Sequence, residues 1–245
     1  MSGSSTPSTD ARNAIKGRMR KALNRHDGDG GLERVREKLA HPAPTLIPAR
    51  ADLKPADRLS LFIEKAKAVQ TDVERVERYE DVPARLAHYL RQRNLPMHLV
   101  KASDPRLDRL DWSSHLIEVR EGRPNADDAV GLTTAFAGIA ETGTLLLASD
   151  ANHPTMLAIL PETAIILLPS HRMARAYEDA LHAYRADGSD LPRSINFITG
   201  PSRSGDIEQT LQLGAHGPKR LLIILVDEDS AEPPIPDVAA KGQAI

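Results

Sequence analysis

The sequence predicts an α/β protein in which helices flank a layered, largely parallel β-sheet. Segments with the periodicity of strands alternate with segments with the periodicity of helices through most of residues 70–226. Two strand segments, 144–149 (TLLLAS) and 164–169 (AIILLP), are continuous apolar runs, as is typical of strands covered on both faces. At 245 residues, the chain is long enough for one substantial core with extensions at its ends.

Composition divides the chain into three regions: an N-terminal helical extension at 1–56, an α/β domain at 57–229 and a polar tail at 230–245. The extension contains a short basic amphipathic helix at 11–25, with Ile15, Met19 and Leu23 on one stripe among arginines and lysines. This helix has two interpretations, a solvated arm or a segment that docks on a partner. A proline-rich connector follows it.

Within the domain, the expected helices are 57–69, 82–94 and 171–186, and 205–214 is expected to be a helix or turn. The first has apolar residues at helical spacing, from Leu59 through Phe62 and Ala66, and the second ends at Asn94 before Pro96. The expected strands are 71–76, 97–101, 115–119, 129–135, 144–149, 164–169, 194–200 and 221–226. They are short and rich in β-branched or apolar residues.

Charge and composition exclude several classes of function. The net charge is −2, so no global field attracts nucleic acid, and Phe, Tyr and Trp total 3%, too few for an aromatic platform that stacks bases. The longest apolar runs, such as 221–226, fall far short of the roughly 20 residues of a membrane helix. No signal peptide is recognisable, so a soluble, cytoplasmic protein is expected.

The chain contains no cysteine, which excludes disulfides, a cysteine nucleophile and thiolate-bound zinc or iron–sulfur clusters. The nine histidines include no H-x-x-x-H or H-E-x-x-H spacing. G-x-G-x-x-G and G-x-x-x-x-G-K-[ST] are also absent. Any redox chemistry would therefore need a bound organic cofactor, a His/carboxylate metal site or a partner chain, and we expect no metal or cofactor in this chain itself.

Polar segments at two places carry the side chains best suited to chemistry. Thr142 and Gly143 follow Glu141 between apolar runs, and the stretch 197–209 (FITGPSRSGDIEQ) follows an expected strand. In open α/β sheets, ligands bind beyond the carboxyl ends of the strands, which is where both segments are expected. The candidate ligand-binding residues are Thr142, Gly143, Gly200, Ser202, Arg203, Ser204, Asp206 and Glu208.

The stretch after the strand has two interpretations. Gly200 and Gly205 permit positive φ angles, so successive backbone N–H groups can form a nest for a small anion. A helix beginning near 204–206 would add its positive end, and Arg203 would pair with a carboxylate or phosphate. Alternatively, acidic residues cap that helix and the glycines serve only a turn. The residues alone leave both open.

Glu141 and His216 are the candidate catalytic residues. Glu141 is either a buried acid in a cleft, acting as a base or nucleophile, or a carboxylate that caps neighbouring N–H groups. His216 lies between two glycines just before the last strand, where it either faces a ligand or is a hydrogen-bonded structural residue. Both alternatives stay open.

Three stretches taken in order resemble the lactate utilisation protein C family, also called the LUD domain: AETGTLLL (140–147), LPETAIILLPS (160–170) and ITGPSRSGDIEQTLQLGAHGPKRLLIILV (198–226). The resemblance runs from about residue 57 to 227. The third stretch is the most specific, because Gly-Pro-Ser, Asp-Ile-Glu and Gly-x-His-Gly-Pro occur in it together.

The resemblance implies a fold similar to the superfamily of ribose-5-phosphate isomerase, glucosamine-6-phosphate deaminase and CoA-transferases. It also implies a role in oxidising L-lactate to pyruvate as a subunit of a complex, with iron–sulfur clusters on partner proteins. Alternatives are a stand-alone enzyme with Glu141 as base or nucleophile, and a module that binds a small anion for assembly or regulation. Whether this subunit is itself catalytic, and whether it self-associates, is left open.

Overall fold

The computed structural model describes residues 9–23, 31–40, 47–187, 192–204, 212–228 and 233–237. The chain divides into two compact units, residues 1–45 and 46–245. In the first, α1 (Thr9–Ala22) and α2 (Gly31–Ala40) expose every side chain that is described, including the apolar stripe of Ile15, Met19 and Leu23. The basic helix expected near residues 11–25 is therefore present, with its apolar stripe uncovered.

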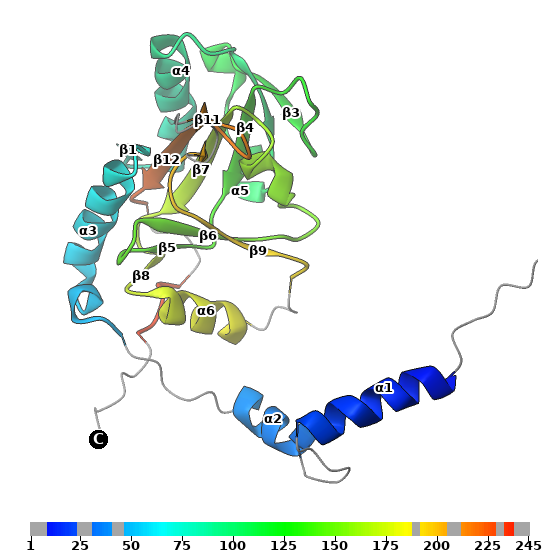
Figure 1. The fold of residues 1–245 in the computed structure, drawn as a ribbon. Helices are drawn as coiled ribbons and strands as arrows, with labels where there is room; N and C mark the ends of the chain where they lie inside the picture. Colours follow the sequence, from blue (N-terminus) through cyan, green and yellow to red (C-terminus); the bar gives the residue numbers. More distant parts are fainter. Residues whose placement is uncertain are drawn as a thin grey trace, which may run out of the picture. The chain divides into compact units, whose positions relative to one another are not determined.

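The second unit is built around a six-stranded parallel sheet (Figure 1). Its strand order is β1 (Asp72–Val76), β12 (Arg220–Val226), β7 (Thr163–Pro169), β4 (Val130–Thr134), β2 (His98–Lys101) and β3 (Glu118–Glu121). Every neighbouring pair is parallel. The predicted α/β class with a largely parallel sheet is confirmed.

A second sheet, not foreseen from the sequence, has the order β8 (Met173–Ala174), β5 (Ala137–Ile139), β6 (Thr144–Ala148) and β9 (Ile195–Ile198). The run 144–149 was expected in the layered parallel sheet, but β6 is antiparallel to both of its neighbours here. The reason is the connection between β5 and β6, which spans only residues 140–143. A parallel crossover needs a dozen or more residues, so this pair closes as a hairpin.

Four helices cover the sheets: α3 (Pro55–Ala68), α4 (Val82–Gln92), α5 (Pro105–Asp108) and α6 (Tyr177–Ala186). Single 3₁₀ turns lie at Ala49–Ala51 (η1), Tyr79–Asp81 (η2), Ser113–His115 (η3) and Thr155–Ala158 (η4). The helix expected over 171–186 begins only at Tyr177, because Met173–Ala174 pair with β5 instead. The strand expected at 115–119 lies instead at Glu118–Glu121, after the turn η3, and neither α5 nor β5 was expected.

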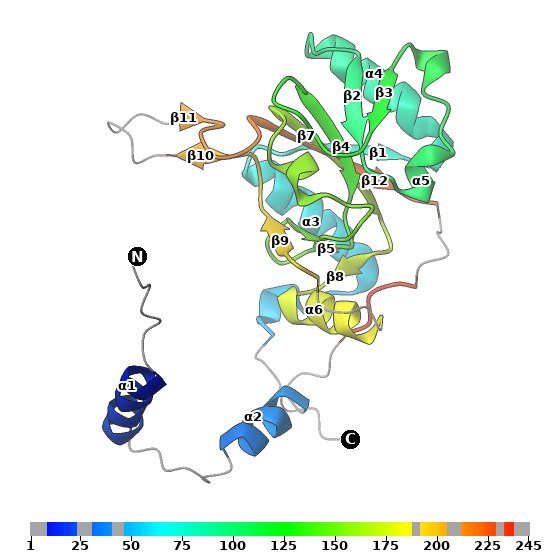
Figure 2. The same ribbon diagram turned by 90° about the vertical axis from the view of Figure 1, so that its right-hand side faces the viewer.

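Side chains alternate along β7 between two separate cores. Ile165 and Leu167 pack toward α4, whereas Ile166 and Leu168 pack toward α3 and the second sheet. A third core lies between the second sheet and α6, seen below that sheet in Figure 2. The second unit is therefore layered as helices, parallel sheet, α3 with the second sheet, and α6.

A small two-stranded ladder joins β10 (Arg203–Ser204) and β11 (Gln212–Leu213) and projects beyond the end of β9 (Figure 2). The stretch 205–214 was expected to be a helix or turn, with a helix start near residues 204–206. A helix that continues to residue 214 is wrong, because Gln212–Leu213 form β11 and pair with Arg203–Ser204 in an antiparallel ladder. Residues 205–211, which carry Asp206 and Glu208, lie outside the described residues.

Candidate functional site

The predicted motifs at 141–144 and 199–202 lie beside each other because β6 and β9 are paired. Leu145 is opposite Ile198 in the antiparallel register, so the start of β6 meets the end of β9. The Oγ1 atoms of Thr144 and Thr199 are 2.6 Å apart, and those of Thr142 and Thr144 are 2.7 Å apart. The Tyr177 hydroxyl lies 3.2 Å from the hydroxyls of both Thr142 and Thr144. We call these four residues the hydroxyl cluster.

Four hydroxyl groups in contact can both donate and accept hydrogen bonds. Thr199 and the neighbouring Phe197 are exposed, so the cluster is open to solvent at that end. The ring of Phe197 also contacts that of Tyr177, at 5.1 Å between centroids. The arrangement suits a small polar ligand whose own hydroxyl or carboxylate joins the network.

Glu141 is 9% exposed, and its carboxylate is turned toward a residue of η1. Arg50 Nη2 donates to Glu141 Oε1 at 2.5 Å, while the Arg50 side chain is itself 67% exposed. The backbone N–H of Glu141 donates to the carbonyl oxygen of Arg175 at 3.1 Å. Glu141 is therefore a buried carboxylate whose ion-pair partner, Arg50, is itself largely exposed. A catalytic role for Glu141 stays a prediction.

Gly143 and Gly200 have positive φ angles of 67° and 83° and lie against the C-terminal half of α3. A Cβ at residue 143 would lie 2.4 Å from the backbone nitrogen of Ala66, and one at 200 would lie 2.9 Å from the carbonyl oxygen of Val69. The two glycines bring the hairpin and the end of β9 against the helix. In the structure, both glycines allow close packing against α3. Ligand binding by these glycines stays a prediction.

Ser202 organises the segment that precedes the last strand. Its N–H donates to the carbonyl of Pro218 at 2.8 Å, and its carbonyl accepts from Gly214 at 3.0 Å. Its Oγ accepts from the backbone N–H of His216 at 3.4 Å. The side chains of His216 and Arg203 are exposed, so the GPS and GAHGP motifs meet through backbone groups.

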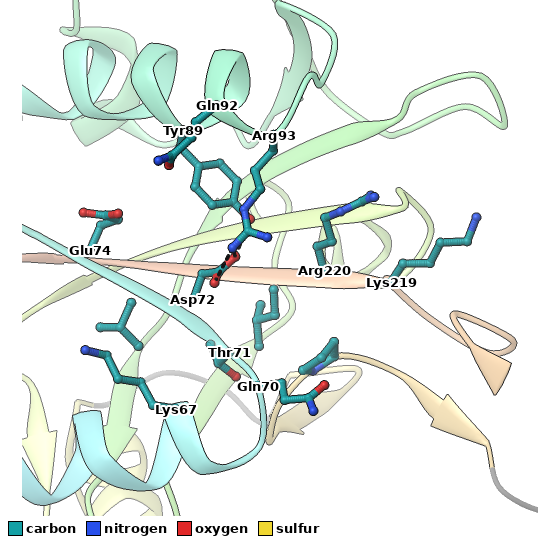
Figure 3. Close-up of a pocket in the computed structure, with 13 residues that line it drawn as sticks. Lys67, Gln70, Thr71, Asp72, Glu74, Tyr89, Gln92, Arg93, Lys219 and Arg220 are labelled. Atoms are coloured by element: carbon teal, nitrogen blue, oxygen red, sulfur yellow. Dashed lines mark hydrogen bonds and ion pairs between the residues drawn. The ribbon is translucent and has the colours of Figure 1, made fainter. Parts of the chain in front are cut away.

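The motif at 200–204 does not lie at the carboxyl edge of the six-stranded sheet, where it was expected. Pro201 lines a pocket beside Asp72 and Arg220, the first residues of β1 and β12 (Figure 3). The cause is the pairing of β9 with β6 in the second sheet, so the end of β9 does not share an edge with the ends of the parallel strands. The motif therefore lies at the amino edge.

The carboxyl edge of the large sheet carries a different cluster, centred on Asp104 just after β2. The side chain of Asp104 is 3% exposed. It accepts from the N–H of Arg106 at 2.8 Å, from Thr134 Oγ1 at 2.7 Å and from Arg106 Nη2 at 2.6 Å. His153 Nε2 is 3.0 Å from Asp104 Oδ2, and His153 Nδ1 is 2.9 Å from Asp150. We call these five residues the Asp104 cluster.

Electrostatics fix the protonation states of this cluster. Burial alone would raise the pKa of Asp104, but the hydrogen bonds from His153 and Arg106 outweigh burial and hold that pKa well below its usual range. The hydrogen bond to Asp104 raises the pKa of His153, against a smaller opposing effect of burial. With both ring nitrogens facing carboxylates, the arrangement favours the imidazolium form of His153, which bridges the two carboxylates.

A cavity of about 250 Å³ opens beside this cluster, lined by Arg106, Thr134, Ala135, Phe136, Ala148, Asp150, His153, Arg172, Tyr184, Asp187 and Pro233. Arg172 lies over the Phe136 ring, 4.4 Å from its centroid. This cluster was not predicted from the sequence, although Asp104 before Pro105 is a recognisable helix start soon after a strand. Among the described residues no three His, Asp or Glu side chains converge as metal ligands would.

The comparisons with known proteins agree on one family. The family model for the LUD domain matches residues 59–226. Lactate utilization protein C of Halalkalibacterium halodurans is 32% identical over an alignment of 226 positions, and the match covers 80% of this chain and 96% of that protein. The protein of the same name from Oceanobacillus iheyensis is 29% identical over an alignment of 224 positions, and that match covers 80% of this chain and 93% of that protein.

A solved structure supports the fold. The crystal structure of a DUF162 family protein from Deinococcus radiodurans matches with a TM-score of 0.53 at 20% identity, over 71% of this chain and 99% of that chain. In the described part of the chain, no helix has the length and apolar character needed to cross a membrane. With the family match extending from α3 to the last strand of the sheet, this chain belongs to the LUD domain family.

Proposed function

We propose that this chain takes part in the utilisation of L-lactate. The observation that carries the proposal is the match to relatives named lactate utilization protein C over nearly their whole length, 96% in one case. The two segments of the family motifs also lie together in the fold, at the hydroxyl cluster. A role shared with those relatives is the simplest account of both.

The finer proposal is that the chain supports oxidation of L-lactate to pyruvate within a complex. This oxidation removes two protons and two electrons from the carbinol group, so it needs an electron acceptor. The 245 residues contain no cysteine, so thiolate-bound iron–sulfur clusters would be on partner proteins. In this proposal the chain contributes a binding surface or a proton-handling group, and not the redox centre.

Two places in the chain suit a small hydroxycarboxylate. The cavity of about 250 Å³ beside the Asp104 cluster presents the guanidinium groups of Arg106 and Arg172, which favour a carboxylate. The hydroxyl cluster offers partners for a hydroxyl group, and Glu141 lies next to it in sequence as the candidate base. Complementation with variants separates the two.

The test is growth on L-lactate as the only carbon source after deletion of the gene. We expect growth to be lost on L-lactate, kept on pyruvate, and restored by the intact chain. The purified chain is expected to bring down a partner that contains iron and acid-labile sulfide. Unchanged growth of the deletion strain on L-lactate contradicts the proposal.

Glu141→Gln tests the candidate base, with Glu118→Gln on β3 as the matched control, since Glu118 is exposed and also loses one negative charge. If Glu141 acts as a base, the first variant is folded but does not restore growth, and the control does. Full growth with Glu141→Gln removes Glu141 from the mechanism and leaves the Asp104 cluster as the place to examine.

A further inference from the structure

The pocket at the amino edge of the large sheet is used by neither of the clusters above. It has a volume of about 610 Å³ and lies between the end of α3, the starts of β1 and β12, and α4 (Figure 3). Its lining has four cationic side chains, Lys67, Arg93, Lys219 and Arg220, and two carboxylates, Asp72 and Glu74. Such a volume is in the range of sites for organic cofactors and metabolites.

Both carboxylates of the pocket already have cationic partners. Arg93 Nη2 donates to the two oxygens of Asp72 at 2.8 Å, and the Tyr89 hydroxyl donates to Asp72 at 2.8 Å. Glu74 accepts from Arg85, which lies outside the lining, at 3.4 Å. Since neither carboxylate is left for a cationic ligand, the charge that remains to be satisfied is positive.

The four cationic side chains of the lining are less completely paired with carboxylates. Among the described residues, no hydrogen bond or ion pair is formed by the side chains of Arg220 and Lys67, whereas Lys219 Nζ contacts Glu162 at 2.5 Å. Figure 3 shows Arg220 and Lys219 extending on the same side of the pocket, with Lys67 on the other side of Asp72. An anion beside Arg220 and Lys219 would meet two adjacent cationic donors at the start of β12.

Two further features of the lining favour a ligand with both polar and apolar parts. Thr71 is 3% exposed, and its hydroxyl has no hydrogen-bond partner in the described part of the chain, a costly arrangement for a buried polar group. Val73 and Pro201, both partly exposed, add apolar surface to the lining. A bare inorganic ion would leave this surface uncovered.

We propose that the amino-edge pocket binds an organic phosphate of about mononucleotide size, with its phosphate on Arg220 and Lys219. The organic part lies against Val73 and Pro201. The site is on the opposite edge of the sheet from the Asp104 cluster, and it does not depend on the proposed role in lactate utilisation. L-lactate itself is much too small to fill it.

The test is calorimetric titration of the full chain with AMP, ADP, inorganic phosphate and L-lactate as probes. We expect AMP or ADP to bind more tightly than inorganic phosphate, with affinity falling as salt is raised. Arg220→Gln is expected to weaken this binding at least tenfold. Arg91→Gln, on the same helix as Arg93 but outside the lining, is the matched control and should bind as the wild type does.

Lys67→Gln provides a second variant whose folding is secure, because this side chain is on the exposed face of α3. It should weaken binding of the longer probe, ADP, more than that of inorganic phosphate. The proposal is overturned if neither AMP nor ADP binds at millimolar concentration. It is equally overturned if the Arg91 variant loses as much affinity as the Arg220 variant, which would indicate unspecific attraction.

Discussion

At the scale of single residues, Asp104 shows how much one buried carboxylate organises. Its oxygens accept from the first turn of α5, from the last residue of β4 and from the loop residue His153. Removing the carboxylate would take away the partner that Arg106 and His153 share, while the contact of His153 with Asp150 would stay in place. The position is therefore structural first, and any ligand in the adjacent cavity benefits from the ordering it imposes.

The imidazolium of His153 makes a pH-dependent contribution to stability. Because the hydrogen bond to Asp104 raises its folded pKa, this contribution is fully present below the unfolded value of about 6.5 and is lost as pH rises through the folded pKa. We expect the free energy of unfolding of the wild type to exceed that of His153→Gln by about 1–2 kcal/mol near pH 5.5, and by much less near pH 9. Urea unfolding at several pH values measures this difference, with exposed His88→Gln as control.

Gly143 tests whether packing or backbone freedom explains the glycine of the ETGT motif. Gly143→Ala places its Cβ 2.4 Å from the backbone of α3, whereas Gly122→Ala, at a φ of 115°, meets nothing within 4 Å. We expect about 1–2 kcal/mol of destabilisation for the Gly122 variant, from strain alone, and at least about 3 kcal/mol for the Gly143 variant. Equal values in urea unfolding would show that the contact with α3 is unimportant.

At the scale of elements, the edge strand β3 has a specific side-chain anchor. Lys101, 7% exposed at the end of β2, contacts both Glu121 of β3 and Asp108 of α5. Burial alone would lower the pKa of Lys101, but its hydrogen bonds to these two carboxylates outweigh burial and raise it. The strand is paired on one side only, so this buried cation is a large share of what joins its end to the sheet.

Lys101→Met keeps an unbranched side chain one atom shorter and removes the charge. We expect the amides of Glu118–Glu121 to exchange with solvent about tenfold faster, which corresponds to about 1.4 kcal/mol of local stability. Exchange in β7, at the centre of the sheet, should change little. Lys65→Met on α3, a partly exposed lysine paired with exposed Glu64, is the control. Unaltered protection of β3 in the Lys101 variant would refute the anchor.

At the scale of the whole molecule, hydrophobic periodicity and the sequence motifs predicted the fold class but not the division into two sheets. The alternation of strand and helix segments through residues 70–226 and the order of the motifs were enough to indicate a parallel α/β fold and its family. The antiparallel pairing of β6 with β9 was missed because a continuous apolar run such as 144–149 reads the same in either kind of sheet. That pairing is also why the 200–204 motif lies at the amino edge, a long-range consequence that local spacing does not contain.

The division into units yields a prediction for the whole chain. Deleting residues 1–45 should leave the thermal midpoint of the remaining unit unchanged, because the described side chains of α1 and α2 are exposed and contribute no core. Deleting residues 1–52 removes buried Ala51, the Arg50 partner of Glu141 and the Asp52 contact with Arg175. We expect the thermal midpoint to fall by about 4–8 °C, since about 2 kcal/mol is lost from a domain of this size.

Calorimetry of both truncations beside the full chain tests these two predictions. Equal midpoints for the two would mean that η1 contributes nothing to the fold, and a large fall already at residue 45 would mean that the first unit packs on the second.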